Sequence, residues 1–172
     1  MGLASDLGYS IAPSTGFQRA VRVVASSRPG AWTLARILPA LDRVVSRLSR
    51  GRTTAAEVLA GLPVLVVTTT GRRSGLPRSA QLIGVPFAGD VALIGTNFGQ
   101  SGTPTWVLNL EADPRAVVMH RDVARDVVAR VASDAERSEI LTLAGQVYVG
   151  YPKYFTRVTD RHVRIFVLEQ AS

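Results

Sequence analysis

The chain has 172 residues, 47% of them apolar and 6% aromatic, which suits one globular domain with a real core and excludes a disordered chain. Its net charge of +7 comes from nineteen arginines and a single lysine and favours anionic partners, while the lack of cysteine excludes disulfides and thiolate chemistry. The two histidines, His120 and His162, fall in β-like stretches and are expected on the surface, so no metal site and no Ser-His triad are predicted.

Residues 1–16 are mostly small and polar and include several glycines, which predicts a flexible N-terminal arm. They lack the basic and apolar regions of a secretory signal. No apolar run approaches the ~20 residues that span a bilayer. We therefore expect a cytoplasmic protein.

Residues 17–60 form a helical N-terminal segment by their three- and four-residue apolar spacing, clearest over residues 32–50. Arginines repeat on another face of that helix. A basic amphipathic helix can lie on an anionic membrane, which would place the protein at the inner face of the cell membrane. The alternative is a helix packed on the core with its arginines in water.

From residue 61 onward the patterns predict six strands and two helices in one domain, residues 61–172. Most of these strands follow one another directly along the chain, and the two helices occur only in its later part. This order favours an antiparallel, barrel-like α+β domain. The helix over residues 135–147 follows a capping box, Ser133 with Glu136. The predicted strands are 64–70, 79–87, 91–96, 116–120, 123–131 and 163–169.

The first two strands are joined by residues 71–78, the arginine loop, which is the most informative stretch of the chain. Arg72, Arg73 and Arg78 surround a turn that contains Gly71 and Gly75. Guanidinium groups bind phosphate and carboxylate bidentately, and glycines let a ligand approach the backbone. The loop therefore predicts an anion site, and the alternative is a solvated hairpin turn. It is not a P-loop, because no Lys-Ser/Thr follows the second glycine.

A second candidate stretch begins at Thr96, continues through residues 97–102, the central loop, and ends in a short helix over residues 105–110. A Gly-rich loop that leads into a helix N-terminus suits an anionic or carbonyl-rich ligand. Trp106 and Asn109 share one face of the helix. The alternative is that Trp106 belongs to the core and Asn109 caps the helix end.

Three of the four tyrosines occur at a spacing of three within residues 148–154, the tyrosine segment. Phenols can stack on a planar ring and donate a hydrogen bond or a proton without carrying charge. Tyr148, Tyr151 and Tyr154 could therefore line one side of a pocket. The alternative is an aromatic core at a helix end.

Together these stretches resemble the deazaflavin-dependent nitroreductase family, also called coenzyme F420-dependent quinone reductases. The matching segments are residues 66–78, residues 104–114, the Tyr-x-x-Tyr-x-x-Tyr run and residues 167–169, so the resemblance covers about residues 60 to 170. It implies a six-stranded antiparallel split β-barrel, related to FMN-binding barrels, with flanking helices.

The resemblance also implies a cofactor, coenzyme F420, an 8-hydroxy-5-deazaflavin whose phosphate and oligoglutamate tail is anionic; FMN is the second choice. Tyr148, Tyr151 and Tyr154 match the tyrosines that line the acceptor pocket and serve as the catalytic residues. The positions that match the family's cofactor-binding residues are Arg72, Arg73, Ser74, Gly75, Arg78, Thr96, Asn97, Gly99, Trp106 and Asn109.

The predicted function is a reductase that transfers a hydride from reduced F420 to a quinone- or nitroaromatic-like acceptor, as a monomer or homodimer. The bulky Phe98 and Gln81 depart from the family pattern and keep open a non-catalytic carrier of deazaflavin, flavin or lipid on the same barrel. A nucleic-acid binder is suggested only by the charge, and the chain has no recognisable binding motif for one.

Overall fold

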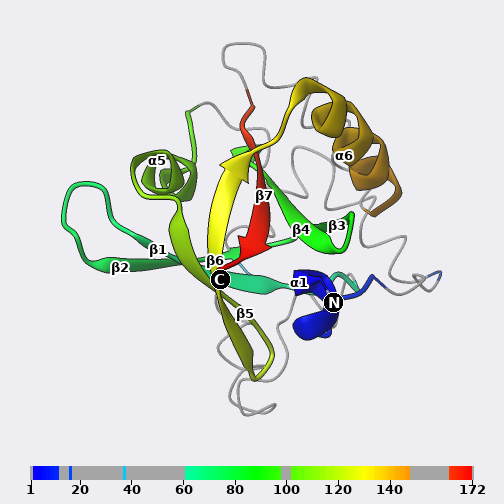
Figure 1. Cartoon of the computed structure of the whole chain (residues 1–172), viewed down its shortest axis with the longest axis horizontal. Helices are drawn as coiled ribbons and strands as arrows, with labels where there is room; N and C mark the ends of the chain where they lie inside the picture. Colours follow the sequence, from blue (N-terminus) through cyan, green and yellow to red (C-terminus); the bar gives the residue numbers. More distant parts are fainter. Residues whose placement is uncertain are drawn as a thin grey trace.

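A computed structural model describes residues 2–11, 16, 37, 61–97, 102–147 and 163–171 (Figure 1). The predicted helices over residues 17–60, the tyrosine segment and Gly99 therefore lie outside the described residues, apart from Ile37. The described helices are α1 (Leu3–Asp6), α5 (Thr105–Ala112) and α6 (Asp134–Val147). The strands are β1 (Leu65–Thr70), β2 (Pro77–Leu82), β3 (Val85–Phe87), β4 (Asp90–Ile94), β5 (Arg115–His120), β6 (Val123–Val131) and β7 (Ile165–Gln170).

All strand pairs are antiparallel, and they form one curled sheet in the order β2-β1-β5-β6-β7-β4-β3. Residues alternate between the two faces, as β5 shows most clearly: Ala116, Val118 and His120 are buried, and the residues between them are exposed. Figure 1 shows the sheet curling into a half-barrel, with α6 packed beside β3 and β4. The α+β antiparallel barrel expected from the sequence is confirmed.

The sheet has seven strands, and the prediction of six is corrected by a break at Gly84. A Cβ atom on Gly84 would lie 2.4 Å from Cγ1 of Val91, so the backbone here sits against β4. The Gly84 N–H and C=O both bond to the hydroxyl of Tyr9, each at 3.0 Å. Because a side chain takes these backbone groups, the predicted strand 79–87 divides into β2 and β3, which form opposite edges of the sheet.

The N-terminal residues 2–11 pack onto the barrel, so the prediction of a flexible arm over residues 1–16 is wrong for them. Leu3 and Leu7 are 1% and 2% exposed, and the Ala4 N–H donates to the Gly89 carbonyl at 3.0 Å. One helical turn places the buried side chains of α1 on one face. The apolar residues are too few to stand out in a segment of mostly small and polar residues.

His120 is 3% exposed rather than a surface residue as predicted. Its Nδ1 lies 3.1 Å from the carbonyl oxygen of Leu7, and its ring meets that of Tyr9 edge-on. The residue lies on the inward face of β5, where residues 2–11 cover it. The burial of His120 thus follows from the packing of residues 2–11.

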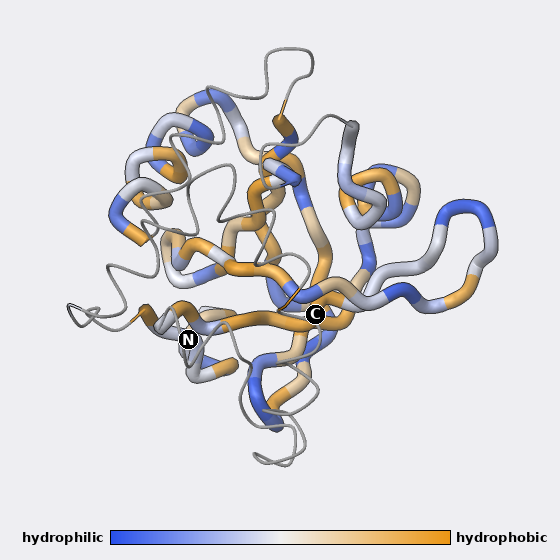
Figure 2. The backbone as a smooth tube through the Cα atoms, turned by 180° about the vertical axis from the view of Figure 1, so that it is seen from behind, coloured by the Kyte–Doolittle hydropathy of each residue, from blue (hydrophilic) through white to orange (hydrophobic). Residues whose placement is uncertain are grey.

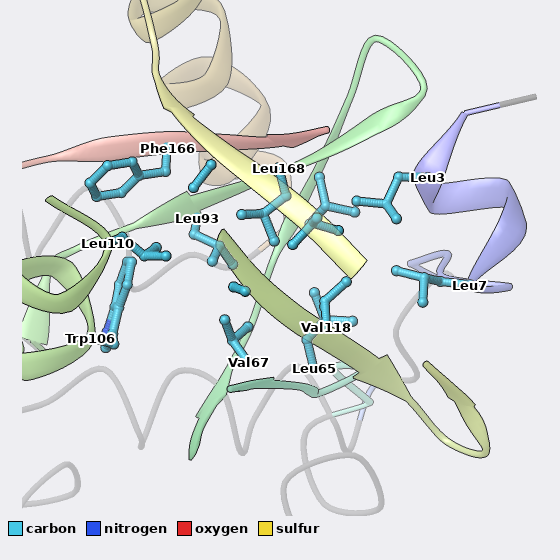
Figure 3. Close-up of a cluster of buried hydrophobic side chains, with 14 of the residues drawn as sticks. Leu3, Leu7, Leu65, Val67, Leu93, Trp106, Leu110, Val118, Phe166 and Leu168 are labelled. Carbon is cyan, nitrogen blue, oxygen red and sulfur yellow. The ribbon is translucent and has the colours of Figure 1, made fainter. Parts of the chain in front are cut away.

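The buried apolar side chains of the described residues form two hydrophobic clusters. The first lies inside the curled sheet, where Leu3 and Leu7 from the N-terminal segment stand at one end and Trp106 and Phe166 at the other (Figure 3). The second lies between α6 and the β3–β4–β7 side of the sheet and includes Ile140 and Ala144. Within the described part of the chain, no helix is both long and apolar enough to cross a membrane.

The predicted capping box at α6 is confirmed. The Ser133 N–H donates to a Glu136 carboxylate oxygen at 2.8 Å, and the Glu136 N–H donates to the Ser133 hydroxyl at 3.4 Å. Arg130 on β6 binds the same carboxylate through both terminal nitrogens and also reaches Glu169 on β7. These bonds tie the first turn of α6 to two strands.

Candidate cofactor-binding site

The arginine loop is closed by hydrogen bonds within its own backbone. The Gly71 N–H donates to the Leu76 carbonyl at 2.9 Å, and the Gly71 carbonyl accepts from the Ser74 and Gly75 N–H groups at 3.1 and 2.7 Å. Gly75 has φ of +67°, a conformation that favours glycine. The loop therefore has a defined shape, set by its two glycines.

Gly71 serves this turn rather than a ligand. A Cβ atom there would lie 2.8 Å from the Ser74 hydroxyl oxygen and 3.0 Å from the Leu76 carbonyl oxygen, so the turn leaves no room for one. The N–H groups of residues 71, 72, 74, 75 and 76 all have partners within the protein. The sequence suggested that a ligand approaches this backbone. Because these N–H groups already have partners, a ligand would bind mainly to the side chains of the loop.

Those side chains are exposed guanidinium groups. Arg72, Arg73 and Arg78 are all exposed, and within the described residues no carboxylate forms an ion pair with any of them. The loop projects from the body as a hydrophilic tip (Figure 2). Other arginines do pair with carboxylates: Arg115 with Asp113, Arg130 with Glu136 and Glu169, and Arg164 with Glu111. The arginine loop thus gathers three exposed guanidinium groups that form no ion pair within the described residues, which suits an anion.

Asn109 lies beneath this loop and not at a solvent-facing position. It is 1% exposed, its Oδ1 accepts from the Arg72 N–H at 3.1 Å, and its Nδ2 donates to the Thr69 hydroxyl at 3.0 Å. The Thr69 hydroxyl in turn donates to the Arg78 carbonyl at 3.3 Å. Both ends of the amide are thus bonded to protein, so Asn109 neither caps the helix by its side chain nor presents it to a ligand.

Trp106 belongs to the core, which was the alternative to a ligand-facing position for this residue. Its side chain is 9% exposed, and its ring lies 6.2 Å from that of Phe166 in an edge-on arrangement. Figure 3 shows it beside Leu110 at one end of the inner cluster. In this arrangement Trp106 fixes α5 on the sheet and offers little surface to a cofactor.

Thr96 and Asn97 follow the end of β4 and lead into the central loop. Thr96 is 6% exposed, whereas Asn97 is partly exposed, has φ of +49° and donates from Nδ2 to the Gly102 carbonyl at 3.3 Å. Gly95 precedes them, and a Cβ atom there would lie 2.8 Å from Cγ2 of Val107 on α5. Of this pair, only Asn97 has a side chain open to a ligand.

The arginine loop and residues 95–97, the stem of the central loop, thus lie beside the same helix, α5: Arg72 bonds to Asn109, and Gly95 lies against Val107. Thr69 and Gly95 support this arrangement and were missed as site residues, because a threonine in a β-branched run and a glycine at a strand end carry no distinctive signal. Gly99 and the three tyrosines lie outside the described residues. In the described ranges no group of His, Asp and Glu side chains could hold a metal ion.

A family model described as F420H(2)-dependent quinone reductase matches residues 41–170. The chain belongs to this family. A solved structure of an F420-H2 dependent reductase (FDR-A) is 33% identical, with a TM-score of 0.57 over 62% of this chain and 94% of that one. A second structure, described as a domain-swapped dimer, is 29% identical, with a TM-score of 0.59 over 82% of this chain and 99% of that one.

Membership of the F420H2-dependent quinone reductase family makes this protein an oxidoreductase with coenzyme F420 as its cofactor, on the split β-barrel fold. The described residues fit that cofactor. A phosphate and glutamate tail needs cationic partners, and the arginine loop supplies three guanidinium groups with no competing carboxylate among the described residues.

Proposed function

We propose that the protein reduces a quinone- or nitroaromatic-like acceptor with a hydride from reduced F420, and that the arginine loop binds the cofactor's phosphate and glutamate tail. The observation that carries this proposal is the set of exposed side chains of Arg72, Arg73 and Arg78, which form no ion pair with any described residue, on a loop closed by its own backbone hydrogen bonds. The hydroxyl of Ser74 accepts from the Leu76 N–H at 3.3 Å and retains its own proton to donate to the same tail.

In this proposal the bound deazaflavin supplies the hydride, so the protein needs no nucleophile, consistent with a chain that lacks cysteine. The protein orients the cofactor and excludes water. Asn97 faces the deazaflavin ring from the stem of the central loop, beside the buried Thr96 and with Gly99 further on. The phenols of Tyr148, Tyr151 and Tyr154 orient the acceptor and donate a proton to it.

The arginine assignment is tested by Arg72→Ala and Arg78→Ala. Each change removes charge-assisted hydrogen bonds worth roughly 1.5–3 kcal/mol, so the dissociation constant for F420 should rise at least tenfold with little change in turnover at saturating cofactor. Arg125→Ala is the matched control, because Nη1 of Arg125 donates to the Ala124 carbonyl at 2.8 Å on β6, away from the loop. Unchanged dissociation constants in both loop variants would exclude tail binding by this loop.

The acceptor role of the tyrosines is tested by phenylalanine variants, which keep the ring and remove only the hydroxyl. Tyr154→Phe, and next Tyr148→Phe, should lower acceptor turnover ~10- to 100-fold at unchanged F420 affinity, because positioned proton transfer contributes ~100-fold or more. Tyr151 precedes Pro152, which restricts its backbone, so its variant should have less effect. Full activity in all three variants would assign these rings to packing.

Three finer points remain predictions. The acceptor class is tested by comparing kcat/KM for quinones and nitroaromatic compounds. Membrane contact through residues 17–50 is tested by sedimentation with anionic vesicles. A homodimer is one of two expected states, and light scattering separates it from a monomer. We do not retain the carrier alternative, because the family is one of enzymes.

A further inference from the structure

The arginine loop is anchored from below by a short chain of buried hydrogen bonds. Asn109 and Thr69 are 1% and 2% exposed, and each uses its polar side chain to bind the other and the loop backbone. The anchor points are the N–H of Arg72 and the carbonyl of Arg78. Both residues carry exposed guanidinium groups that form no ion pair with any described residue.

The loop's own bonds and the buried chain have different effects. The bonds between Gly71 and residues 74–76 set the shape of the turn, but they join the loop only to itself. The bond from Arg72 to Asn109 joins the turn to α5, and so fixes the direction in which the loop extends from the sheet. An apolar side chain of the same size at position 109 would fill the space but leave the Arg72 N–H without this acceptor.

Helix α5 also contacts the other half of the site. Val107 packs against Gly95 at the stem of the central loop, two residues before Asn109 reaches the arginine loop. Successive residues rise ~1.5 Å along a helix, so the two contacts are only about 3 Å apart along its axis. A single rigid helix therefore sets the distance between the two loops.

We propose that Asn109 and Thr69 are positioning residues for cofactor binding: they hold the arginine loop on α5 so that Arg72 and Arg78 meet the acidic tail while the ring lies beside Asn97. The inference rests on the proposed function of the arginine loop. Neither side chain touches the cofactor. Their effect is preorganisation, since a loop already held in place loses less conformational freedom when the ligand binds.

The decisive variant is Thr69→Val, which keeps the shape and β-branching of the side chain and removes only the hydroxyl. Thr69→Ser restores the hydroxyl and should rescue the effect. Thr68→Val is the matched control: Thr68 neighbours Thr69 on β1, but its exposed hydroxyl bonds to the hydroxyl of Ser79 on β2, at 2.8 Å. Asn109→Leu removes the same chain of bonds from the helix side.

Two ligands separate positioning from general stability: F420, and its deazaflavin headgroup without phosphate and glutamates. Thr69→Val and Asn109→Leu should weaken F420 about tenfold, the effect of ~1.4 kcal/mol, and leave headgroup affinity unchanged. In the ligand-free protein, amide hydrogen exchange at Arg72 should become faster in Asn109→Leu, and Thr68→Val should behave as wild type.

Equal weakening of both ligands by Thr69→Val would overturn the inference, because it would indicate a general loss of structure. A second outcome would also overturn the inference: F420 affinity falls in Arg72→Ala and Arg78→Ala but stays at the wild-type value in Thr69→Val and Asn109→Leu. That outcome would leave the proposed function intact. If the arginine variants bind F420 as wild type does, the proposed function itself fails.

Discussion

Replacing Tyr9 by phenylalanine tests whether residues 2–11 are part of the folded domain. The Tyr9 hydroxyl accepts from the Gly84 N–H at 3.0 Å and lies 3.0 and 3.2 Å from the Gly84 and Pro63 carbonyl oxygens. The residue is 3% exposed, so water does not easily replace the lost group. Phenylalanine keeps the ring and opens no large cavity, so the change isolates the hydroxyl.

The expected cost follows from these contacts. A hydrogen bond contributes a net ~0.5–1.5 kcal/mol, and a buried donor left without a partner, here the Gly84 N–H, costs ~1–3 kcal/mol. Together the loss in unfolding free energy should be roughly 2–3 kcal/mol. In a chain of this size each kcal/mol shifts Tm by ~2–4 °C, so Tm should fall by about 4–12 °C.

Urea denaturation followed by circular dichroism measures this loss, with the slope m expected to stay constant. Ser79→Ala is the control: it also deletes one hydroxyl, but its bond to Thr68 is exposed, so the change should stay within about 0.5 kcal/mol. A Tyr9→Phe protein as stable as the Ser79→Ala control would refute the reasoning and show that residues 2–11 are not docked in solution.

Two further predictions concern the helices. Trp106→Ala should destabilise the protein by ~3–5 kcal/mol because a buried ring that packs against Phe166 is lost, and a wild-type Tm would contradict this. The Arg130 guanidinium, with the Ser133 hydrogen bonds, lowers the pKa of Glu136 from its usual 4.5 to about 2. The ionised Glu136 carboxylate therefore stabilises the folded protein above pH 4.5, and this stabilisation is lost as the pH falls towards 2. Glu136→Gln should flatten the stability profile in that window, measured by denaturation across pH, and a profile parallel to wild type would argue against the interaction.

Elements that depend on local patterns were predictable. The strand over residues 116–120, the capping box of α6 and the short helix that begins at residue 105 each depend on residues within a few positions of one another. The arginine loop was recognisable for the same reason, since two glycines and three arginines occur within eight residues. The match of the chain to the family model, over residues 41–170, agrees with the fold and the cofactor that the resemblance implied.

Contacts between distant residues decided the rest. The sequence by itself determined the positions of most strands, the helices α5 and α6 and the presence of a cationic loop, because side-chain periodicity and turn chemistry act over short distances. It did not determine that Tyr9 bonds to Gly84, 75 positions away, or that His120 is covered by Leu7, 113 positions away. Nor did it reveal that Asn109, 37 positions from Arg72, supports the loop rather than facing a ligand. A polar side chain looks the same in sequence whether it meets solvent, a ligand or a buried backbone group. Only the packing of α5 and of residues 2–11 onto the sheet excludes water from these side chains and determines their hydrogen-bond partners.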